Sequence, residues 1–218
     1  FGEEFSLMSF CDGESLKHMP AIQDHKRAYE KDMGPNTGGM GTYSDAGHSL
    51  PFLNPGDIKE AYHINVQTAQ ALKDKFGEGY KGILYGGFMA TKDGVKLIEY
   101  NARFGDPEAM NALSLLETDL IELCNAIADG TLNNIDVRFT NKATVCKYAV
   151  PEGYPDKPVK GKNIDTSKVA DPDRLFYASV DIKSGQLIEA GSRTVAVVGV
   201  ADSISEAEKI AENEIASV

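Results

Sequence analysis

Hydrophobic and polar residues alternate along residues 5–10, Phe-Ser-Leu-Met-Ser-Phe, which is the pattern of a half-buried strand. Two further apolar runs, residues 82–89 and 95–98, flank a Lys-Asp-Gly turn and predict a β-hairpin. Between the first strand and the hairpin, apolar positions recur at helical spacing from Ile58 to Phe76, and a glycine follows. We therefore expect a sheet with one long helix beside it.

The pattern becomes helical again over residues 108–128, with a break expected near Thr118. Residues 131–142 look like a polar linker, which suggests a domain boundary within this stretch. We predict an α+β fold with two domains. Residues 1–137 would form an antiparallel sheet with flanking helices, and residues 138–218 a small β-rich domain.

Three strands and a closing helix are predicted in the second domain. The strands are expected at residues 143–150, 175–182 and 194–200, separated by turns rich in proline and glycine. Ser205 and Glu208 form a Ser-x-x-Glu capping box, so the final helix is expected to begin at Ser205. Its apolar positions should pack on the strands.

The composition narrows the class of protein. Of the 218 residues, 42% are hydrophobic and 25% are charged, which is ordinary for a soluble globular protein. No apolar run approaches the roughly 18 residues needed to span a bilayer, so no membrane association is expected. The net charge of −11 argues against a nucleic-acid partner, since phosphate backbones bind basic surfaces. Three scattered cysteines favour neither disulfides nor a zinc site, and fit a reducing cytoplasm.

The most informative stretch is the decapeptide that begins at Glu99, Glu-Tyr-Asn-Ala-Arg-Phe-Gly-Asp-Pro-Glu. Strand alternation puts Glu99 and Asn101 on one face and Tyr100 on the other. Two hard oxygen donors at a strand end suit Mg²⁺, which leaves positions open for phosphate oxygens. Arg103 adds a planar fork suited to phosphate or carboxylate. The alternative is that these side chains are simply solvated at the end of the strand.

A second informative stretch is the glycine loop, residues 34–41, within a segment 32–48 expected to be irregular. Its four glycines would let the backbone approach a ligand and present successive N–H groups to an anion. By itself the loop could equally be a surface turn, and it is neither a Walker A loop nor a dinucleotide fingerprint. Six basic residues would supply cations for anionic ligands: Lys17, His18, His25, Lys26, Arg27 and Lys31.

Three motifs in order carry a family resemblance: Gln-Asp-His-Lys-Arg at residues 23–27, Gly-Pro-Asn-Thr-Gly-Gly-Met-Gly at 34–41, and Arg-Phe-Gly-Asp-Pro-Glu at 103–108. Together they resemble the glycinamide ribonucleotide synthetase (phosphoribosylamine–glycine ligase) family, whose fold is ATP-grasp. The resemblance is close over residues 1–128 and looser beyond. It implies the second half of an ATP-grasp module followed by the family's small C-terminal domain.

The family's reaction is the ATP-dependent ligation of glycine to 5-phosphoribosylamine through a glycyl phosphate, a step of purine biosynthesis. The resemblance assigns Mg²⁺ or Mn²⁺ to Glu99 and Asn101, and catalytic roles to Arg103, Asp106 and Glu108. It also implies a set of substrate-binding residues: Asp24, His25, Lys26, Arg27, Gly34, Pro35, Asn36, Thr37, Gly38, Gly39 and Met40.

The resemblance also places the first residue about midway along the family's enzyme. The chain opens within a strand pattern and without an initiator Met, so we expect a fragment that is inactive without the missing N-terminal half. ATP-grasp folds often draw another metal ligand from the preceding strand, but the expected position, near Gly87, has no side chain. Two alternatives are another ATP-grasp carboxylate–amine ligase, resembling biotin carboxylase or D-alanine ligase, and a non-catalytic nucleotide-binding module.

Overall fold

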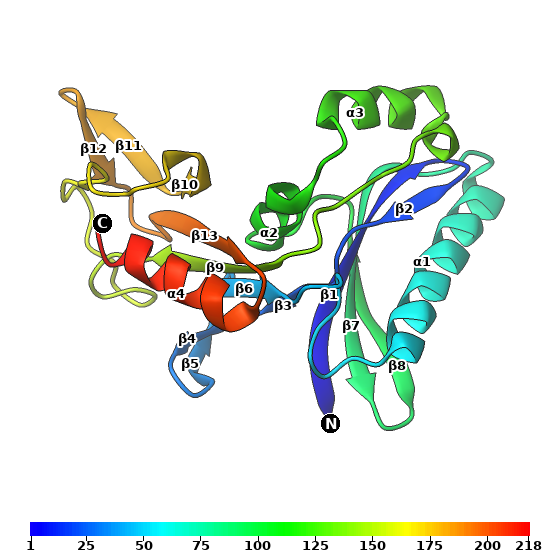
Figure 1. Ribbon diagram of the computed structural model, residues 1–218, viewed down its shortest axis with the longest axis horizontal. Helices are drawn as coiled ribbons and strands as arrows, with labels where there is room; N and C mark the ends of the chain where they lie inside the picture. Colours follow the sequence, from blue (N-terminus) through cyan, green and yellow to red (C-terminus); the bar gives the residue numbers. More distant parts are fainter.

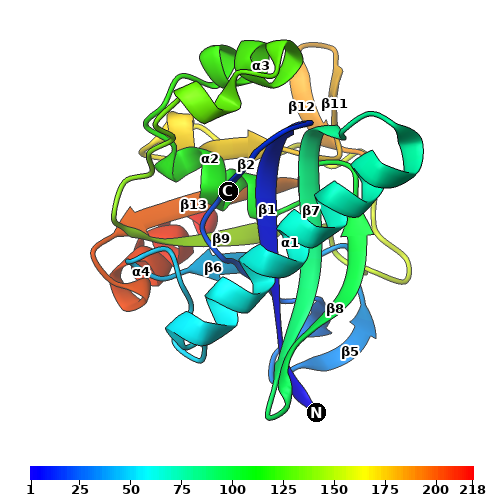
Figure 2. The same ribbon diagram turned by 90° about the vertical axis from the view of Figure 1, so that its right-hand side faces the viewer.

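The computed structural model describes residues 1–218 and contains two main sheets. The first is antiparallel, in the order β2-β1-β7-β8, and comprises β1 (Gly2–Asp12), β2 (Leu16–His18), β7 (Lys81–Thr91) and β8 (Gly94–Asn101). Helix α1 (Pro55–Phe76) crosses one face of this sheet over β1, β7 and β8 (Figure 2). The strand, hairpin and helix predicted from periodicity are therefore confirmed.

The second sheet has five antiparallel strands in the order β10-β13-β9-β6-β3. They are β3 (Gln23–Asp24), β6 (Gly41–Ser44), β9 (Ala143–Ala149), β10 (Leu175–Tyr177) and β13 (Val195–Ala201). Strands from the beginning and from the end of the chain thus share one sheet, near the centre of Figure 1. This sheet brings the segment 23–27 and the glycine loop, residues 34–41, next to the C-terminal strands.

Two hairpins extend from the second sheet, and a C-terminal helix packs on it. Helix α4 (Ile204–Ile215) packs on β9 and β13. The hairpin of β4 (Arg27–Tyr29) and β5 (Met33–Asn36) projects below the sheet in Figure 1, whereas β11 (Val180–Lys183) and β12 (Gln186–Glu189) project at the upper left. No helix combines the length and the apolar character required to cross a membrane.

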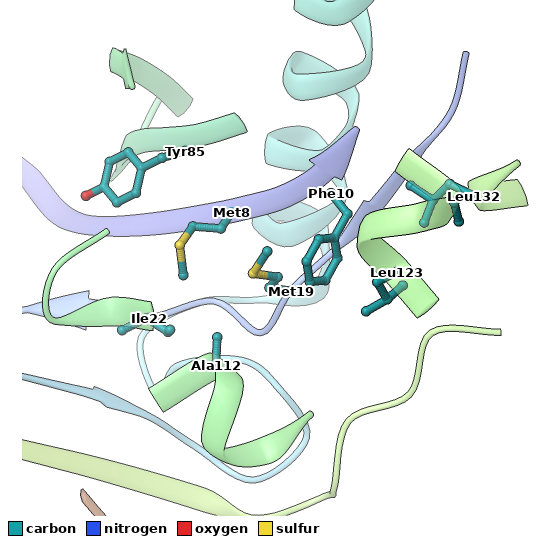
Figure 3. Close-up of a cluster of buried hydrophobic side chains, with 9 residues drawn as sticks. Met8, Phe10, Met19, Ile22, Tyr85, Ala112, Leu123 and Leu132 are labelled. Atoms are coloured by element: carbon teal, nitrogen blue, oxygen red, sulfur yellow. The ribbon is translucent and has the colours of Figure 1, made fainter. Parts of the chain in front are cut away.

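The largest cluster of buried side chains lies between the first sheet and two short helices, α2 (Glu108–Leu115) and α3 (Leu120–Asp129) (Figure 3). It comprises Met8, Phe10, Met19, Ile22, Tyr85, Ala112, Leu123, Ala126 and Leu132. The break between the two helices matches the prediction near Thr118. Because α2 begins at Glu108, this core also fixes the position of that carboxylate.

The prediction of a polar linker at residues 131–142 is wrong. Leu132 lies in a 3₁₀ turn, Leu132–Asn134, and is fully buried, while Val137 and Phe139 pack against the same core. Polar residues between these positions face solvent, so the mean polarity of the segment hides its apolar contacts. The segment therefore runs along the body of the molecule rather than between separate bodies.

Three element boundaries also differ from the predictions. The irregular segment expected at 32–48 contains β5 and β6, and the single strand expected at 175–182 is divided into β10 and β11. Helix α4 is capped by Ser203, whose Oγ accepts the N–H of Glu206 at 3.3 Å, and not by Ser205. Ser203 has the extended backbone that an N-cap requires, which the sequence pattern alone does not reveal.

Candidate active site

The segment 23–27 and the glycine loop, residues 34–41, fold against one another. Three backbone N–H groups donate across the junction: Thr37 to the carbonyl of Lys26, Met40 to that of His25, and His25 to that of Gly41, at 2.7, 2.8 and 2.8 Å. A fourth bond runs from the Arg27 guanidinium to the carbonyl of Gly34, at 2.8 Å. Two motifs that are separate in the sequence thus form one structural unit.

Three N–H groups of the glycine loop are used by the hydrogen bonds that shape it. Besides the amides of Thr37 and Met40, the N–H of Gly39 donates to Oγ1 of Thr37 at 3.1 Å. Of residues 37–40, Gly38 alone has an N–H without a hydrogen-bond partner. The prediction of successive free N–H groups is therefore wrong for this stretch, because the bonds that shape the loop consume them.

Gly39 joins this unit to the Arg-Phe-Gly-Asp-Pro-Glu motif, residues 103–108. It is buried, with φ of +106°, and a Cβ at this position would lie 2.6 Å from Cδ of Pro107 and 2.7 Å from Oδ1 of Asp24. Both distances are shorter than any real Cβ contact, so only glycine fits here. The loop consequently packs directly on the Asp106–Pro107 turn of the Arg-Phe-Gly-Asp-Pro-Glu motif.

Asp24 presents a buried carboxylate oxygen at this junction. Its Oδ1 has almost no solvent exposure and no hydrogen-bond partner. Burial, together with the nearby negative charge of Glu108, raises the pKa of Asp24 to about 7. A buried polar atom without a partner is costly in a folded protein, and such atoms concentrate at sites that bind a ligand.

Glu99 and Asn101 lie side by side at the end of β8, as predicted. The Asn101 amide donates to Oε1 of Glu99 at 3.2 Å, while the hydroxyl of Tyr100 points to the other face and donates to Asn65 of α1 at 2.9 Å. Glu99 is exposed and Asn101 half-buried. Oxygen donors of both side chains are therefore accessible from one side of the sheet.

These two donors fit a divalent cation that is shared with a phosphate ligand. No three or more His, Cys, Asp or Glu side chains of the chain are grouped to hold a metal by themselves. Mg²⁺ is often held by only one or two carboxylates, with substrate phosphates and water completing its octahedron. A Glu–Asn pair at an open strand end has the right chemistry for that arrangement.

The three charged residues of the Arg-Phe-Gly-Asp-Pro-Glu motif have different surroundings. Arg103 is exposed and donates to the neighbouring carbonyl of Phe104 at 2.7 Å, so most of its guanidinium is free for an anion. Glu108 is 3% exposed, and its Oε1 accepts the hydroxyl of Tyr85 at 2.8 Å. Asp106 is exposed and makes its contacts to the second sheet.

Two adjoining cavities bring together residues of the segment 23–27 and of the decapeptide that begins at Glu99. A small one, about 20 Å³, is lined by Glu99 and Glu108 among others, and a larger one, about 530 Å³, by His25 and Arg27 among others. Three residues line both: Glu4, Asp24 and Lys26. The amine of Lys26 pairs with the Glu4 carboxylate at 3.0 Å. Glu99, one of the two predicted metal ligands, and the basic segment therefore face a continuous region, whereas Asn101 lines neither cavity.

Other predicted residues lie outside these two cavities. Met40 lines another, mostly apolar cavity of about 370 Å³. Asn36 lines the 530 Å³ cavity. The six basic residues do not form one cluster. His18 is stacked on Tyr62 in α1 and bonded to Ser9, so it belongs to the first sheet rather than to the site. A further cavity, of about 850 Å³, contains no predicted site residue.

Two family models match the chain: the ATP-grasp (A) domain of phosphoribosylglycinamide synthetase over residues 1–109, and the C domain of the same synthetase over residues 144–218. The chain belongs to the phosphoribosylglycinamide synthetase family. The A-domain match contains all three sequence motifs. The C-domain match contains β13, α4 and all but the first residue of β9.

Known proteins agree with this membership. The phosphoribosylamine–glycine ligase of Methanosarcina barkeri is 54% identical over 98% of this chain and 49% of its own length. The crystal structure of phosphoribosylamine–glycine ligase from Thermotoga maritima has a TM-score of 0.83 at 30% identity, covering all of this chain and 53% of that one. A biotin carboxylase domain, with a TM-score of 0.62 at 13% identity over 92% of this chain and 42% of that one, shares the fold alone. The chain spans about half the length of the curated relatives it matches.

Sequence reasoning missed two residues that contact the site from the second sheet. Arg193, in the turn before β13, donates to the carbonyls of Gly38 and Gly39 and to the carboxylate of Asp106. Tyr148, near the end of β9, donates its hydroxyl to the same carboxylate at 2.8 Å. A lone arginine beside a turn and a tyrosine in a strand carry no local signal, so only the fold reveals them.

Proposed function

We propose that the complete protein, meaning a protein of the relatives' length that contains this chain, ligates glycine to 5-phosphoribosylamine at the expense of ATP. The products would be glycinamide ribonucleotide, ADP and phosphate, in purine biosynthesis. One observation carries the proposal: Asp24 and Lys26 line a cavity with Glu99 and Glu108 and a second cavity with His25 and Arg27. A site for ATP phosphates and a metal would thus adjoin a site for a sugar phosphate.

The reaction has two steps that need alignment more than covalent help from the protein. An oxygen of the glycine carboxylate attacks the γ-phosphorus of ATP, and ADP leaves, giving glycyl phosphate. The amine of phosphoribosylamine then attacks the acyl carbon, phosphate leaves, and the amine gives up a proton. Catalysis of this kind rests on positioning and on neutralising phosphate charge.

Within the proposed site, Glu99 and Asn101 hold Mg²⁺ or Mn²⁺, which would neutralise charge on the ATP phosphates. Arg103 would bind the phosphoryl group or the glycine carboxylate through its guanidinium. That guanidinium is largely free of other hydrogen bonds, which supports this role. Glu108 is buried and accepts a hydrogen bond from Tyr85, which supports a role in fixing the shape of the site.

The basic segment and the glycine loop form the proposed site for phosphoribosylamine. His25, Lys26 and Arg27 would pair with its phosphate, and the free N–H of Gly38 offers one further donor. Asp24 would accept a hydrogen bond from a substrate amine or hydroxyl, since its Oδ1 has no partner within the chain. The remaining loop residues from Gly34 to Met40 would shape this site rather than contact the phosphate.

We further propose a cytoplasmic protein in which residues 1–137 and 138–218 are the two domains. The five-stranded sheet, which draws strands from both, would be their permanent junction. The other half of the relatives' length would supply the adenine-binding residues. On this proposal the 218 residues alone do not turn over ATP, and measurable ADP release by them would contradict it.

The test is ADP release by the complete protein with Mg²⁺, with glycine or phosphoribosylamine omitted in turn. Release that requires both substrates supports the ligase. Release with another amine or acid in place of one of them would mean a different ATP-grasp ligase, and nucleotide binding without turnover would mean a non-catalytic module. Either outcome contradicts the proposal.

A pair of variants locates the activity in this chain. Glu99→Ala should abolish ADP release because it removes the charged metal ligand. Glu122→Ala is the matched control: it also removes an exposed glutamate, but from the first turn of α3, away from both cavities. Equal activity in the two variants would contradict the role given to Glu99.

A further inference from the structure

Arg193 connects the second sheet to both loops of the candidate site. Its side chain is 15% exposed and reaches away from the turn before β13. Nη1 donates to the carbonyls of Gly38 and Gly39 at 2.8 and 3.1 Å, and Nη2 donates to Oδ2 of Asp106 at 2.8 Å. One guanidinium therefore bonds the glycine loop and the Asp106 turn at the same time.

The ring of Tyr148 stacks against this guanidinium. The Cζ atom of Arg193 lies 4.6 Å from the centre of the tyrosine ring, within cation–π distance. The hydroxyl of Tyr148 donates to Oδ1 of Asp106, so one oxygen of that carboxylate is bonded to β9 and the other to the turn before β13. Several contacts at once thus fix the position of the guanidinium. We name the set of Arg193, Tyr148, Asp106 and the two glycine carbonyls the Arg193 bridge.

The Arg193 bridge links the two segments that meet at Gly39. Asp24 and Pro107 both lie against Gly39, since a Cβ at this position would meet Oδ1 of Asp24 and Cδ of Pro107 at once. Asp24 and Glu108, the residue after Pro107, line the same small cavity. A shift between the glycine loop and the Asp106 turn would therefore change the distance between the carboxylates of Asp24 and Glu108.

We propose that Arg193 is a positioning residue of the active site, which holds the glycine loop and the Asp106 turn in the mutual arrangement that binds the phosphorylated amine substrate. The identity of that substrate rests on the proposed function. The hydrogen bonds of the Arg193 bridge are independent of it. Arg193 acts through the two loops and does not line either of the two cavities. The C-terminal domain would thus be part of the site rather than an appendage.

The chemistry of the bridge requires arginine. Its planar fork donates in two directions, to two backbone carbonyls and to a carboxylate, and it stacks on an aromatic ring. A lysine would keep the charge, but its compact ammonium could not reach both loops while stacking on Tyr148. Arg193→Lys therefore separates the shape of the side chain from its charge.

The experiment compares steady-state kinetics of the complete protein with its Arg193→Lys and Arg193→Ala variants. The KM for phosphoribosylamine should rise by about tenfold or more, because the variants lose the charge-assisted hydrogen bonds that hold the two loops together. The KM for ATP should stay within about twofold of the wild-type value. Millimolar guanidinium should restore part of the loss in Arg193→Ala, because the small cation can occupy the vacated position. Arg138→Gln, which removes an exposed arginine paired with Glu117 and Asp136, is the control and should be unaffected.

A second readout measures the loops without substrate. Backbone amide exchange at Gly39 and Met40 should be faster in both Arg193 variants than in the wild type. Tyr148→Phe keeps the ring under the guanidinium, so it should fold normally and show a smaller change in the same direction. Should Arg193→Ala fail to fold, this variant and Arg193→Lys still test the proposal.

The outcomes separate this proposal from the proposed function. A wild type that does not use phosphoribosylamine would overturn the proposed function by itself. An active wild type with an unchanged KM for phosphoribosylamine in every Arg193 variant would overturn the positioning role, whatever the exchange rates. Equal rises in the KM for all three substrates would do the same, since they would indicate a general loss of structure.

Discussion

Gly87 on β7 lies directly opposite Glu99 on β8. Opposed residues of an antiparallel pair project to the same face, so a side chain at position 87 would point toward the Glu99 carboxylate. A Cβ at Gly87 would lie 3.5 Å from Cγ of Glu99, an ordinary van der Waals contact. The position is therefore open to substitution, and its side chain would approach any ion bound by Glu99.

Gly87→Asp should lower the Mg²⁺ concentration that gives half-maximal ADP release by the complete protein, by about threefold or more. The added carboxylate would supply a third hard oxygen ligand from this chain. Gly87→Ala is the control, because it fills the same space without a ligand and should leave the Mg²⁺ dependence unchanged. A higher Mg²⁺ requirement in Gly87→Asp than in Gly87→Ala would argue against a metal at Glu99.

The sequence was informative where local periodicity decides the structure. The helix over residues 58–76, the hairpin and the shared face of Glu99 and Asn101 all follow from patterns spanning fewer than about 20 residues. The same holds for the break between α2 and α3. In these segments the neighbours along the chain are also the groups that determine which side is buried.

The parts that could not be predicted depend on contacts between distant residues. Arg193 meets Gly38 across 155 positions of sequence, and Asp24 and Pro107, also distant in the sequence, both lie against Gly39. No pattern in a single sequence reports such pairs. The hydrogen bonds of the loop's N–H groups to Lys26, His25 and Thr37 were also missed, because a glycine-rich composition shows what the backbone can do and not which bonds it makes.

Asn111 joins α2 to the second sheet, and its loss should destabilise the protein. It is fully buried, accepts the hydroxyl of Thr42, and donates to the carbonyl of Thr42 and to Oγ1 of Thr144. Asn111→Ala leaves these groups without partners and should lower the free energy of unfolding by about 2–4 kcal/mol. Urea denaturation compares it with Asn133→Ala, an exposed position, which should change the midpoint little.

Asp24 should make stability depend on pH in an identifiable direction. Its pKa is raised from 3.8 to about 7, so the folded protein keeps a proton that the unfolded chain has lost. The stabilisation is complete below about pH 4 and is lost as the pH rises toward 7. Asp24→Asn, which mimics the protonated form, should therefore gain stability over the wild type as the pH rises, by about 2–4 kcal/mol at pH 8.

The measurement for Asp24 is urea denaturation of the wild type and the variant at pH values from about 4 to 8. Asp93→Asn, in the exposed hairpin turn, is the control and should follow the wild type at every pH. The prediction fails if the two curves for Asp24→Asn and the wild type remain parallel. Such a result would mean that the Asp24 carboxylate is ionised in the folded protein near pH 5.

His18 should have the opposite effect, a loss of stability in acid. Its ring stacks on Tyr62 with 4.1 Å between ring centres, its Nδ1 lies 2.8 Å from Oγ of Ser9, and burial lowers its pKa from 6.5 to about 4. The unfolded chain therefore binds a proton that the folded protein does not. The stability present above about pH 6.5 is lost as the pH falls toward 4, by about 3 kcal/mol at most.

His18→Gln removes this titration while keeping a side chain that can hydrogen-bond to Ser9. The variant should start less stable than the wild type near pH 7, because the stacking on Tyr62 is lost, and the difference should shrink as the pH falls to about 4. His63, exposed on the same helix as Tyr62, provides the control, since His63→Gln should not change the slope. A difference between His18→Gln and the wild type that stays constant with pH would show that His18 is protonated without cost in the folded protein.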